Sequence, residues 1–565
     1  MIRKLIFCLL LCISVSVFGE EEVYTYGDFE YTIDANDEVC ITGYNGYDED
    51  LIIPSEINGI KVTSIGNSAF SWCESLLTIY IPDSVTTIGE SAFYSCKVLT
   101  TINIPKSVIS IGGGVFSGCK NLLNVNISDK NENFAVINNI LYNKKEKSVI
   151  SCFSNDSHVA IPSGIKTIKT SAFELCSTIM CINIPNTVTF IESRAFYRCS
   201  SLTTMVIPSS VMRIGTKAFE GCKSLISIDI PNLVSSIETS TFEGCNSLES
   251  VNIPRSVLSI GDRAFLYCYS LTNATLPNSV TSIGNDAFYN CRSLTSINIP
   301  DSVTSIGSSA FYGCSSLTSI SIPDSVTNLG GGIFQQCKNL CNVSISNTND
   351  TFSIIDNILY NKKEKSIISC LSNESHITIS SDIKIIETSA FGWCRTLTSI
   401  TIPDSVISIK TGAFTGCSSL ISINIPSSVA CIDERTFEWC SSLTSINISD
   451  SLTSIGKCAF GNCESLTTIT IPISVTYIGE SAFSRCKSLT SINIPDSVTS
   501  IGDYAFNECK SLTSITIPDS VISIGKEAFD DCPSLTIQCN AGSYAEQYCK
   551  ENDLKYFTTP DWLLD

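Results

Sequence analysis

The sequence predicts a solenoid, a stack of short coils that share nearly the same sequence. Residues 488–510 read SLTSINIPDSVTSIGDYAFNECK, and residues 511–533 repeat them closely as SLTSITIPDSVISIGKEAFDDCP. The phenylalanine of the AF pair returns every 23 residues, 18 times in all, within the blocks 70–116, 173–334 and 391–529. A fixed period of roughly 20–50 residues is typical of repeat arrays and not of a compact catalytic domain.

A single repeat has too few apolar residues to fold alone, which supports this prediction. Burying the eight apolar side chains of residues 488–510 returns less free energy than ordering 23 residues costs. Stacked neighbours supply the missing backbone hydrogen bonds and core, so stability belongs to the whole stack and its end caps. The eight are Leu489, Ile492, Ile494, Val498, Ile501, Ala505, Phe506 and Cys509.

The first 19 residues predict a secretory signal peptide. Arg3 and Lys4 precede an apolar run from Leu5 to Val17, and the expected cleavage site follows Gly19. Downstream we find no apolar run of the roughly 18 residues that a membrane helix needs. We therefore expect an exported chain, secreted or at the cell surface, with no evident anchor and no membrane insertion after signal cleavage.

Both ends of the mature chain predict caps. Residues 20–60 alternate apolar and polar side chains around Gly and Asn turns, which predicts a β-hairpin cap at the N-terminus. Residues 539–565 predict a short helical C-terminal cap, because Ser543 suits a helix N-cap and Tyr544, Tyr548 and Leu554 follow at near-helical spacing. The repeats between the caps span residues 61–538.

Within one repeat, the segment from Leu489 to Pro495 predicts a strand. Its apolar residues alternate with polar ones, and the proline, which lacks an N–H, ends the pairing. Ile492 and Ile494 then point inward and Asn493 faces outward. For the second half we expect a short strand or an irregular segment, followed by a brief helical turn around the AF pair on the opposite side.

This repeat resembles that of the BspA-like (treponemal-type) leucine-rich repeat proteins. The resemblance rests on SLTSINIPDSVTSIGDYAFNEC and its copies, on FEYTI, ITGYNG and LIIPSEINGIKVTSIG at the entry, and on AGSYAEQY at the exit, and it covers nearly all of the mature chain. It implies a leucine-rich-repeat solenoid with a parallel inner β-sheet. Because the period is unbroken on either side of both inserts, we expect the L-x-x-I-x-I strands to form one continuous sheet. The resemblance also implies an exported or surface-displayed protein that attaches to host matrix, host cells or other microbes, without catalytic residues.

Two inserts interrupt the period, at about 124–162 and 342–380. Phe116 to Phe173 and Phe334 to Phe391 are each 57 residues apart, and the two inserts are near copies separated by 218 residues, which indicates an internal duplication. In each, ILYNKKEKS followed by VIS or IIS predicts a projecting hairpin with a basic tip. The tips are candidate binding sites, with a plain solvated turn as the alternative; their lysines are Lys144, Lys145, Lys147, Lys362, Lys363 and Lys365.

Cysteines form a ladder three residues after each anchor phenylalanine. Side chains at one phase of a solenoid stack in parallel, with Cβ atoms farther apart than the roughly 3.8 Å that a disulfide prefers. We therefore favour buried thiols, with a disulfide framework as the alternative in an exported chain. Disulfide candidates are Cys176–Cys181, Cys458–Cys463 and Cys539–Cys549. The structural ladder includes Phe70, Cys73, Phe93, Cys96, Phe506, Cys509, Phe529 and Cys532.

The sequence offers little chemistry for an enzyme. It lacks the motifs G-x-S-x-G, H-E-x-x-H and G-x-x-x-x-G-K-[ST], and its only histidines, His158 and His376, occupy equivalent places in the two inserts. We expect no catalytic residues, no metal and no cofactor. Aspartates that share the slot after the strand-ending proline suit turn capping, with a weak calcium site as the alternative: Asp301, Asp324, Asp404, Asp496 and Asp519.

One face of the predicted stack carries a row of mostly short, uncharged, hydrogen-bonding residues. They lie between the two inward apolar residues of each strand, and a solenoid face of this kind suits an extended partner held by many weak contacts. A merely solvated face is the alternative. The candidate binding face comprises Asn103, Asn183, Asp229, Asn252, Asn298, Thr401, Asn424, Asn447, Thr470, Asn493 and Thr516.

Together these patterns predict a non-enzymatic repeat protein that binds proteins or glycans of a host or a neighbouring cell. The alternative is a structural component of the surface or envelope with no specific host ligand. Loss of the signal peptide would change the net charge from −20 to −22, which argues against nucleic acid or an anionic membrane as a partner.

Overall fold

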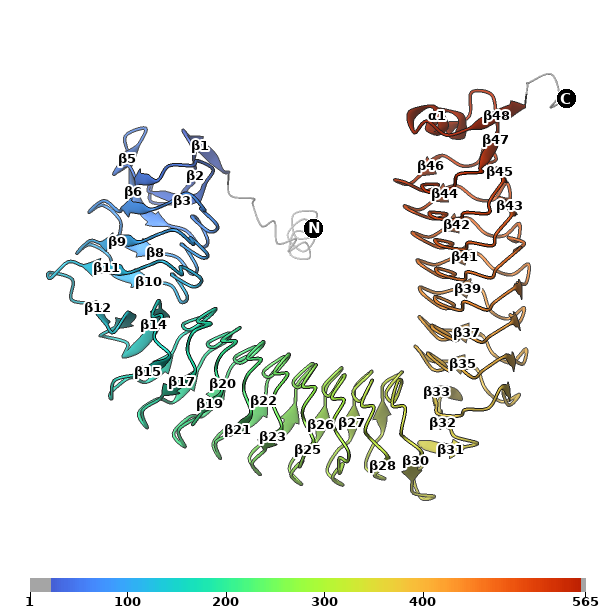
Figure 1. The fold of residues 1–565 in the computed structure, drawn as a ribbon, viewed down its shortest axis with the longest axis horizontal. Coiled ribbons are helices and arrows are strands. Elements are labelled where there is room, and N and C mark those ends of the chain that lie inside the picture. Colours follow the sequence, from blue (N-terminus) through green and yellow to red (C-terminus); the bar gives the residue numbers. More distant parts are fainter. Residues whose placement is uncertain (1–21, 560–565) are drawn as a thin grey trace, which may run out of the picture. The chain divides into compact units, whose positions relative to one another are not determined.

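The computed structural model describes residues 22–559, and the chain forms two compact units, 1–200 and 201–565. Each 23-residue repeat makes one rung, which in most repeats has a first strand, a second strand and a turn around the anchor phenylalanine, here called the Phe turn (Figure 1). Strands of successive rungs pair in parallel, as Ser491 with Ser514 and Ser500 with Ser523. The predicted parallel solenoid is confirmed. The signal peptide predicted for residues 1–19 lies outside the described residues.

First strands form on the L-x-x-I-x-I segments. Unit 1 has β4 (Asp50–Ile52), β7 (Thr78–Tyr80), β9 (Thr101–Ile104) and β11 (Asn124–Ile127) in one sheet, and β15 (His158–Ala160) with β17 (Cys181–Asn183) in another. Unit 2 has β19 (Thr204–Met205), β21 (Ser227–Asp229), β23 (Ser250–Asn252), β25 (Asn273–Ala274), β28 (Ser319–Ile322), β30 (Asn342–Ile345), β34 (His376–Thr378), β36 (Ser399–Thr401), β38 (Ser422–Asn424), β40 (Ser445–Asn447), β43 (Ser491–Asn493), β45 (Ser514–Thr516) and β47 (Thr536–Asn540).

Second strands are mostly two residues long and end just before the glycine of the S-I-G segment. Unit 1 has β6 (Ile60–Ile65), β8 (Thr87–Ile88), β10 (Ser110–Ile111), β16 (Thr167–Ile168) and β18 (Phe190–Ile191). Unit 2 has β20 (Arg213–Ile214), β22 (Ser236–Ile237), β24 (Ser259–Ile260), β26 (Ser282–Ile283), β27 (Ser305–Ile306), β29 (Asn328–Leu329), β35 (Ile385–Ile386), β37 (Ser408–Ile409), β39 (Cys431–Ile432), β41 (Ser454–Ile455), β42 (Tyr477–Ile478), β44 (Ser500–Ile501) and β46 (Ser523–Ile524).

Each insert is a three-stranded antiparallel meander. The first has β12 (Phe134–Ile137), β13 (Ile140–Asn143) and β14 (Ser148–Cys152), and the second has β31 (Phe352–Ile355), β32 (Ile358–Asn361) and β33 (Ser366–Cys370). The predicted hairpins are present, but they do not project. β14 and β33 are buried along their whole length and pair in parallel with β16 and β35, which makes them part of the stack.

The Phe turn replaces the brief helical turn expected from the sequence. Ser68 and Trp72 have left-handed backbones, with φ of 57° and 64°, which a helix does not accommodate. The N–H groups of Ser68, Phe70 and Trp72 donate to carbonyl oxygens of the next rung at 3.0, 2.8 and 2.8 Å. The same pattern recurs along the stack, so the Phe turns form a third ladder between rungs.

The core consists of stacked rows of identical side chains. Successive anchor phenylalanines lie nearly parallel, as Phe483 and Phe506 do with ring centroids 5.3 Å apart. Ile492 and Ile494 are buried and Asn493 is exposed, which confirms the predicted strand phase. Such offset aromatic pairs add stabilisation beyond the area that they bury.

The cysteine ladder carries thiols, as expected. These thiols also have a role that the sequence did not reveal, because most of them donate to the carbonyl oxygen of the anchor phenylalanine in the preceding rung. After the inserts, Cys176 and Cys394 donate to Cys152 O and Cys370 O instead. Cys96 Sγ lies 3.0 Å from Phe70 O, and Cys486 Sγ lies 3.3 Å from Phe460 O. The six cysteines considered as disulfide candidates, which include the ladder members Cys176 and Cys463, are thiols as well.

Polar side chains at fixed phases tie each rung to the one before it. Thr490 Oγ1 donates to Thr467 O at 3.5 Å and Thr499 Oγ1 donates to Thr476 O at 3.2 Å. Ser497 Oγ donates to Val475 O at 2.6 Å. Side-chain hydroxyls thus add hydrogen bonds to the stack, which explains why three of its exposed or half-buried phases favour Ser and Thr.

Caps close the two ends of the stack. β1 (Tyr24–Tyr26), β2 (Phe29–Ile33) and β3 (Val39–Tyr44) form an antiparallel meander, β3 pairs with β6, and β5 (Glu56–Ile57) pairs with β6. At the other end α1 (Tyr544–Glu551) precedes β48 (Tyr556–Thr559), which pairs with β47. Ser543 caps α1 by accepting from the Glu546 N–H, as predicted. Tyr44 and Tyr548 lie against the first and last rings of the phenylalanine rows.

Candidate functional site

The row of outward residues on the first strands is exposed throughout. Asn424, for example, lies between the buried side chains of Ile423 and Ile425. All eleven residues of the candidate binding face occupy this exposed position in their rungs. The structure therefore places them on one side of each unit, but the first-strand sheets are interrupted at both inserts and do not form the single continuous sheet that we expected.

In unit 2 this row includes a shallow groove of about 390 Å³. The groove crosses the rungs from β25 to β30 because short side chains there leave space between the strands. Within the described part of the chain, its lining holds no titratable side chain. The lining comprises Asn273, Ala274, Thr275, Ser296, Ile297, Asn298, Ser319, Ile320, Ser321, Asn342 and Ser344.

Some side chains of the row already bond to one another. Asn447 Nδ2 donates to Asn424 Oδ1 at 2.7 Å, and Asn126 Nδ2 donates to Asn103 Oδ1 at 2.9 Å. Such amide pairs keep part of their donor and acceptor capacity for a partner. Chemically the face can supply many neutral hydrogen bonds, and its residue types do not suggest acid–base or nucleophilic chemistry.

The basic tips lie at the turns of the two hairpins, where residues 144–147 are exposed. Lys144 Nζ donates to Asn131 O at 2.9 Å, and Lys362 makes the equivalent short bond to Asn349 O. Lys169 of the next rung pairs with Glu146 of the first tip at 3.2 Å. Local bonds and a neighbouring carboxylate thus reduce the positive charge that the first tip presents.

The histidines and the repeated aspartates do not assemble a metal site. His158 Nδ1 lies 2.9 Å from Ser157 Oγ, and His376 Nδ1 lies 2.7 Å from Ser399 Oγ, each at the start of an exposed first strand. Asp324 and Asp519 accept from Thr348 and Asn540. In the range 22–559 there is no group of three or more side chains suited to hold a metal ion.

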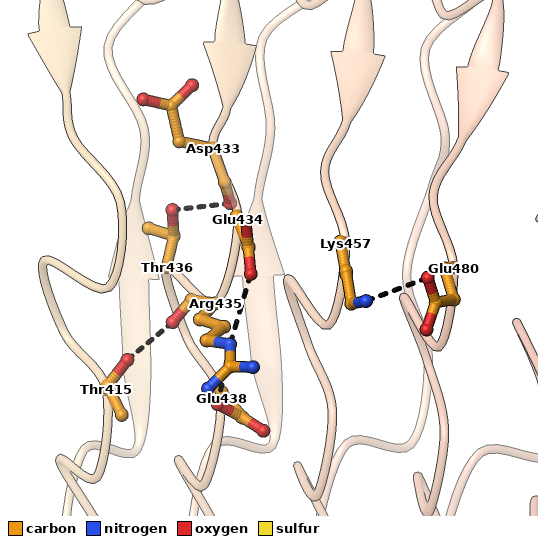
Figure 2. Close-up of polar contacts among 8 residues, drawn as sticks. All are labelled: Thr415, Asp433, Glu434, Arg435, Thr436, Glu438, Lys457 and Glu480. Atoms are coloured by element: carbon orange, nitrogen blue, oxygen red, sulfur yellow. Dashed lines mark hydrogen bonds and ion pairs between the residues drawn. The ribbon is translucent and has the colours of Figure 1, made fainter. Parts of the chain in front are cut away.

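Charged residues on the Phe turns pair locally. Figure 2 shows Arg435, whose Nε lies 3.2 Å from Glu434 and 3.9 Å from Glu438, and Lys457, which bonds to Glu480 of the next rung at 2.8 Å. Burial raises the pKa of Glu438 above its ordinary value. Exposed pairs of this kind contribute little to stability, so they indicate a solvated edge and not a site.

Sequence reasoning missed some residues of these surfaces. Ser296 and Ser319 line the groove and lie two residues before the outward residue of their strands. Only the repetition of serine at this position could have drawn attention to them. Sequence reasoning also left unassigned the aromatic residues of the Phe turns, where Tyr289 and Tyr312 stack at 4.4 Å. Within residues 22–559, no helix is long and apolar enough to cross a bilayer.

A sequence profile of the "BspA type leucine rich repeat region" matches residues 49–155, 146–272, 258–372, 364–490 and 476–561. The chain belongs to the BspA-type leucine-rich repeat family. The family explains the 23-residue rungs and the anchor phenylalanines that every rung shares. No curated protein matches this BspA-type chain in sequence.

Solved structures similar to this BspA-type chain include three from bacteria. A leucine-rich repeat protein from Bacteroides ovatus is 29% identical, over 75% of this chain and 99% of that one, with a TM-score of 0.35. A leucine-rich cell surface protein from Faecalibacterium prausnitzii is 26% identical, over 93% and 97%, with a TM-score of 0.29. A leucine-rich repeat protein from Eubacterium ventriosum is 18% identical, over 91% and 95%, with a TM-score of 0.38.

Proposed function

We propose that this protein is an exported, non-enzymatic attachment protein that binds proteins or glycans of a host or a neighbouring cell. The groove of about 390 Å³ on the first strands of unit 2 carries the proposal. Its lining is uncharged and rich in hydroxyl and amide groups, which suits a neutral, extended stretch of a macromolecule. Repeat faces commonly bind partners in this way, through many contacts of modest strength.

One observation favours a structural role as the second candidate. The Asn447–Asn424 and Asn126–Asn103 bonds run between rungs, so these side chains stabilise the stack itself. In a purely structural surface component, the row would serve rigidity and solubility. The two candidates differ in whether substitutions in the groove change the binding of any partner.

The test uses the chain without its signal peptide on a panel of immobilised fibronectin, laminin, collagen and neutral glycans. The variant Thr275→Lys, Asn298→Lys and Ser321→Lys fills the groove while leaving the inward Ile rows intact. Each neutral hydrogen bond contributes about 0.5–1.5 kcal/mol, so the triple variant should bind its partner at least about tenfold more weakly. Surface plasmon resonance measures the dissociation constant.

A matched control places the same three charges elsewhere in the row. Asn424→Lys, Asn447→Lys and Thr470→Lys occupy the same phase but lie outside the groove. They belong to the same candidate binding face, so they should weaken binding, but less than the groove variant does. Equal weakening by both variants would contradict the groove as the binding site. Binding that is abolished by salt and by replacement of the tip lysines with neutral residues would assign the site to the hairpins. Absence of saturable binding would support the structural role.

A further inference from the structure

A second cleft lies on the Phe-turn side of unit 2, where the second insert replaces one Phe turn. Its volume is about 370 Å³, within the range of sites that hold small ligands or single side chains. The Phe turn before the insert, the end of β33 and the Phe turn after the insert form its walls. Its lining includes Lys338, Leu340, Leu371, Asn373, Trp393 and Arg395.

The equivalent place at the first insert is nearly closed, with a volume of about 80 Å³. Phe153 fills it and packs edge-on against Phe116, with ring centroids 6.0 Å apart. Leu371 stands at this position in the second insert and leaves the space open. Leu340 is accordingly half-buried, whereas its counterpart Leu122 is 1% exposed.

The second cleft also carries more positive charge than the first. Arg395 stands where the first copy has Ser177, and Lys338 matches Lys120. In residues 22–559 neither Lys338 nor Arg395 forms an ion pair, and no carboxylate lines the cleft. On a chain of net charge −20, this is a hollow with a mixed polar and apolar lining, which includes the leucines Leu340 and Leu371 and two cations without an ion pair.

Aromatic residues surround the cleft and fix its wall. The Arg395 guanidinium lies 5.2 Å from the centre of the Trp393 ring, and the indole packs so closely on Gly416 that a Cβ there would come within 2.5 Å of it. The first copy has Leu175 in place of Trp393. Trp, Tyr and Arg are the residues in which binding energy concentrates at protein interfaces.

We propose that this cleft binds an acidic segment of a partner polypeptide, with an apolar side chain in the hollow and adjacent carboxylates on Arg395 and Lys338. The charge complementarity selects this occupant, because among residues 22–559 the two cations have no carboxylate partner, and Leu340 and Leu371 in the lining offer apolar contacts for one side chain. The site is separate from the groove on the first strands, so it stands whether or not the proposed function is correct.

The test uses three acetylated, amidated peptides: Asp-Asp-Leu-Asp-Asp, Ser-Ser-Leu-Ser-Ser and Asp-Asp-Gly-Asp-Asp. Fluorescence anisotropy of labelled peptides should show saturable binding of the first, at least about tenfold stronger than that of the other two. Leu371→Phe, Trp393→Leu and Arg395→Ser each install the residue of the first copy, which the same fold already accommodates. Each should weaken binding about tenfold or more, as expected for loss of a charged bond or of the hollow.

The first insert supplies the matched control. Phe153→Leu should open its cleft without creating binding. The quadruple variant that adds Leu175→Trp, Ser177→Arg and Arg198→Gly should create it, because Arg198 stands where the second copy has the Gly416 on which the indole packs. Absence of saturable binding by the acidic peptide, or equal binding of the Ser-Ser-Leu-Ser-Ser peptide, would overturn the proposal. So would unchanged binding in the Arg395→Ser variant, provided that its circular dichroism spectrum matches that of the parent chain.

Discussion

The two inserts have almost the same backbone but different surfaces. Both are meanders with a bulge at the same place, at Leu141/Tyr142 and at Leu359/Tyr360. The same asparagine accepts from the tip backbone in each, Asn143 at 3.0 Å and Asn361 at 3.0 Å. The clefts beside the two inserts, here called their mouths, differ because Phe153 in the first insert is replaced by Leu371 in the second. Backbone hydrogen bonds thus preserve the duplicated unit, while a few side chains at its mouth are free to change.

The largest expected contrast concerns the residue that fills the mouth. Phe153→Ala removes a 5% exposed ring that packs on Phe116, so it should lower the free energy of unfolding by about 3–5 kcal/mol. Leu371→Ala removes a half-buried side chain and should cost less than about 2 kcal/mol. Urea unfolding followed by fluorescence measures both. Equal losses would show that the two mouths are packed alike.

A smaller contrast concerns the reactivity of two thiols beside the inserts, Cys370 and Cys176, which are not equivalent positions because Cys370 matches Cys152 and Cys176 matches Cys394. A hydrogen bond with the Cys394 thiol lowers the pKa of Cys370, whereas a hydrogen bond with Cys152 and burial raise the pKa of Cys176. The thiolate is the reacting form, so at a given pH below its ordinary pKa Cys370 has the larger thiolate fraction. In native protein, iodoacetamide should label Cys370 at least about tenfold faster than Cys176, and its labelling should begin at lower pH.

Peptide mapping by mass spectrometry measures this labelling, and the denatured chain is its control, because all thiols should then react at similar rates. The same experiment counts the thiols of the ladder, which should be mostly reduced. Faster labelling of Cys176 would contradict the opposite directions of these two pKa shifts.

The smallest expected effect is one that the copies share. Lys144→Met and Lys362→Met each remove one bond to a backbone carbonyl, so each should cost at most about 1 kcal/mol. Amide hydrogen exchange in β12 and β31 should rise to a similar extent in the two variants. A clear difference between them would show that the backbones of the inserts are less alike than their hydrogen bonds indicate.

Much of the fold could be predicted because the same alternation of apolar and polar residues recurs in repeat after repeat. The burial of Ile492 and Ile494 and the exposure of Asn493 follow from alternation alone. The left-handed backbone at Trp72 was missed, although glycines such as Gly118 and Gly221 stand at the same phase in other rungs and indicate it. At Trp72 itself, bonds to the next rung impose this conformation. The pairing of β14 with β16 was also missed, since a local pattern shows a hairpin but not what lies beside it.

Of the two candidate sites, one could be predicted from the sequence and the other could not. The exposed row on the first strands is a consequence of strand phase and could be listed from the sequence. Its binding role stays a prediction. The cleft beside Trp393 could not be found from the sequence, because the exchange of Phe153 for Leu371 looks conservative. Only the packing of Phe153 on Phe116 shows that this exchange changes the volume of the mouth.

The Phe turns of the last block, residues 391–529, have an electrostatic consequence. Tyr504, Phe506 and Glu508 donate their N–H groups to carbonyl oxygens of the following rung, and the equivalent residues of the preceding rungs do the same. The dipoles of these peptide groups therefore align along the stack. Aligned peptide dipoles leave partial positive charge at the end where N–H groups point outward, as in a helix. That end is the rung of Phe529, which carries Glu527, Asp530 and Asp531. A rung added beyond it would separate these carboxylates from the positive pole that they stabilise.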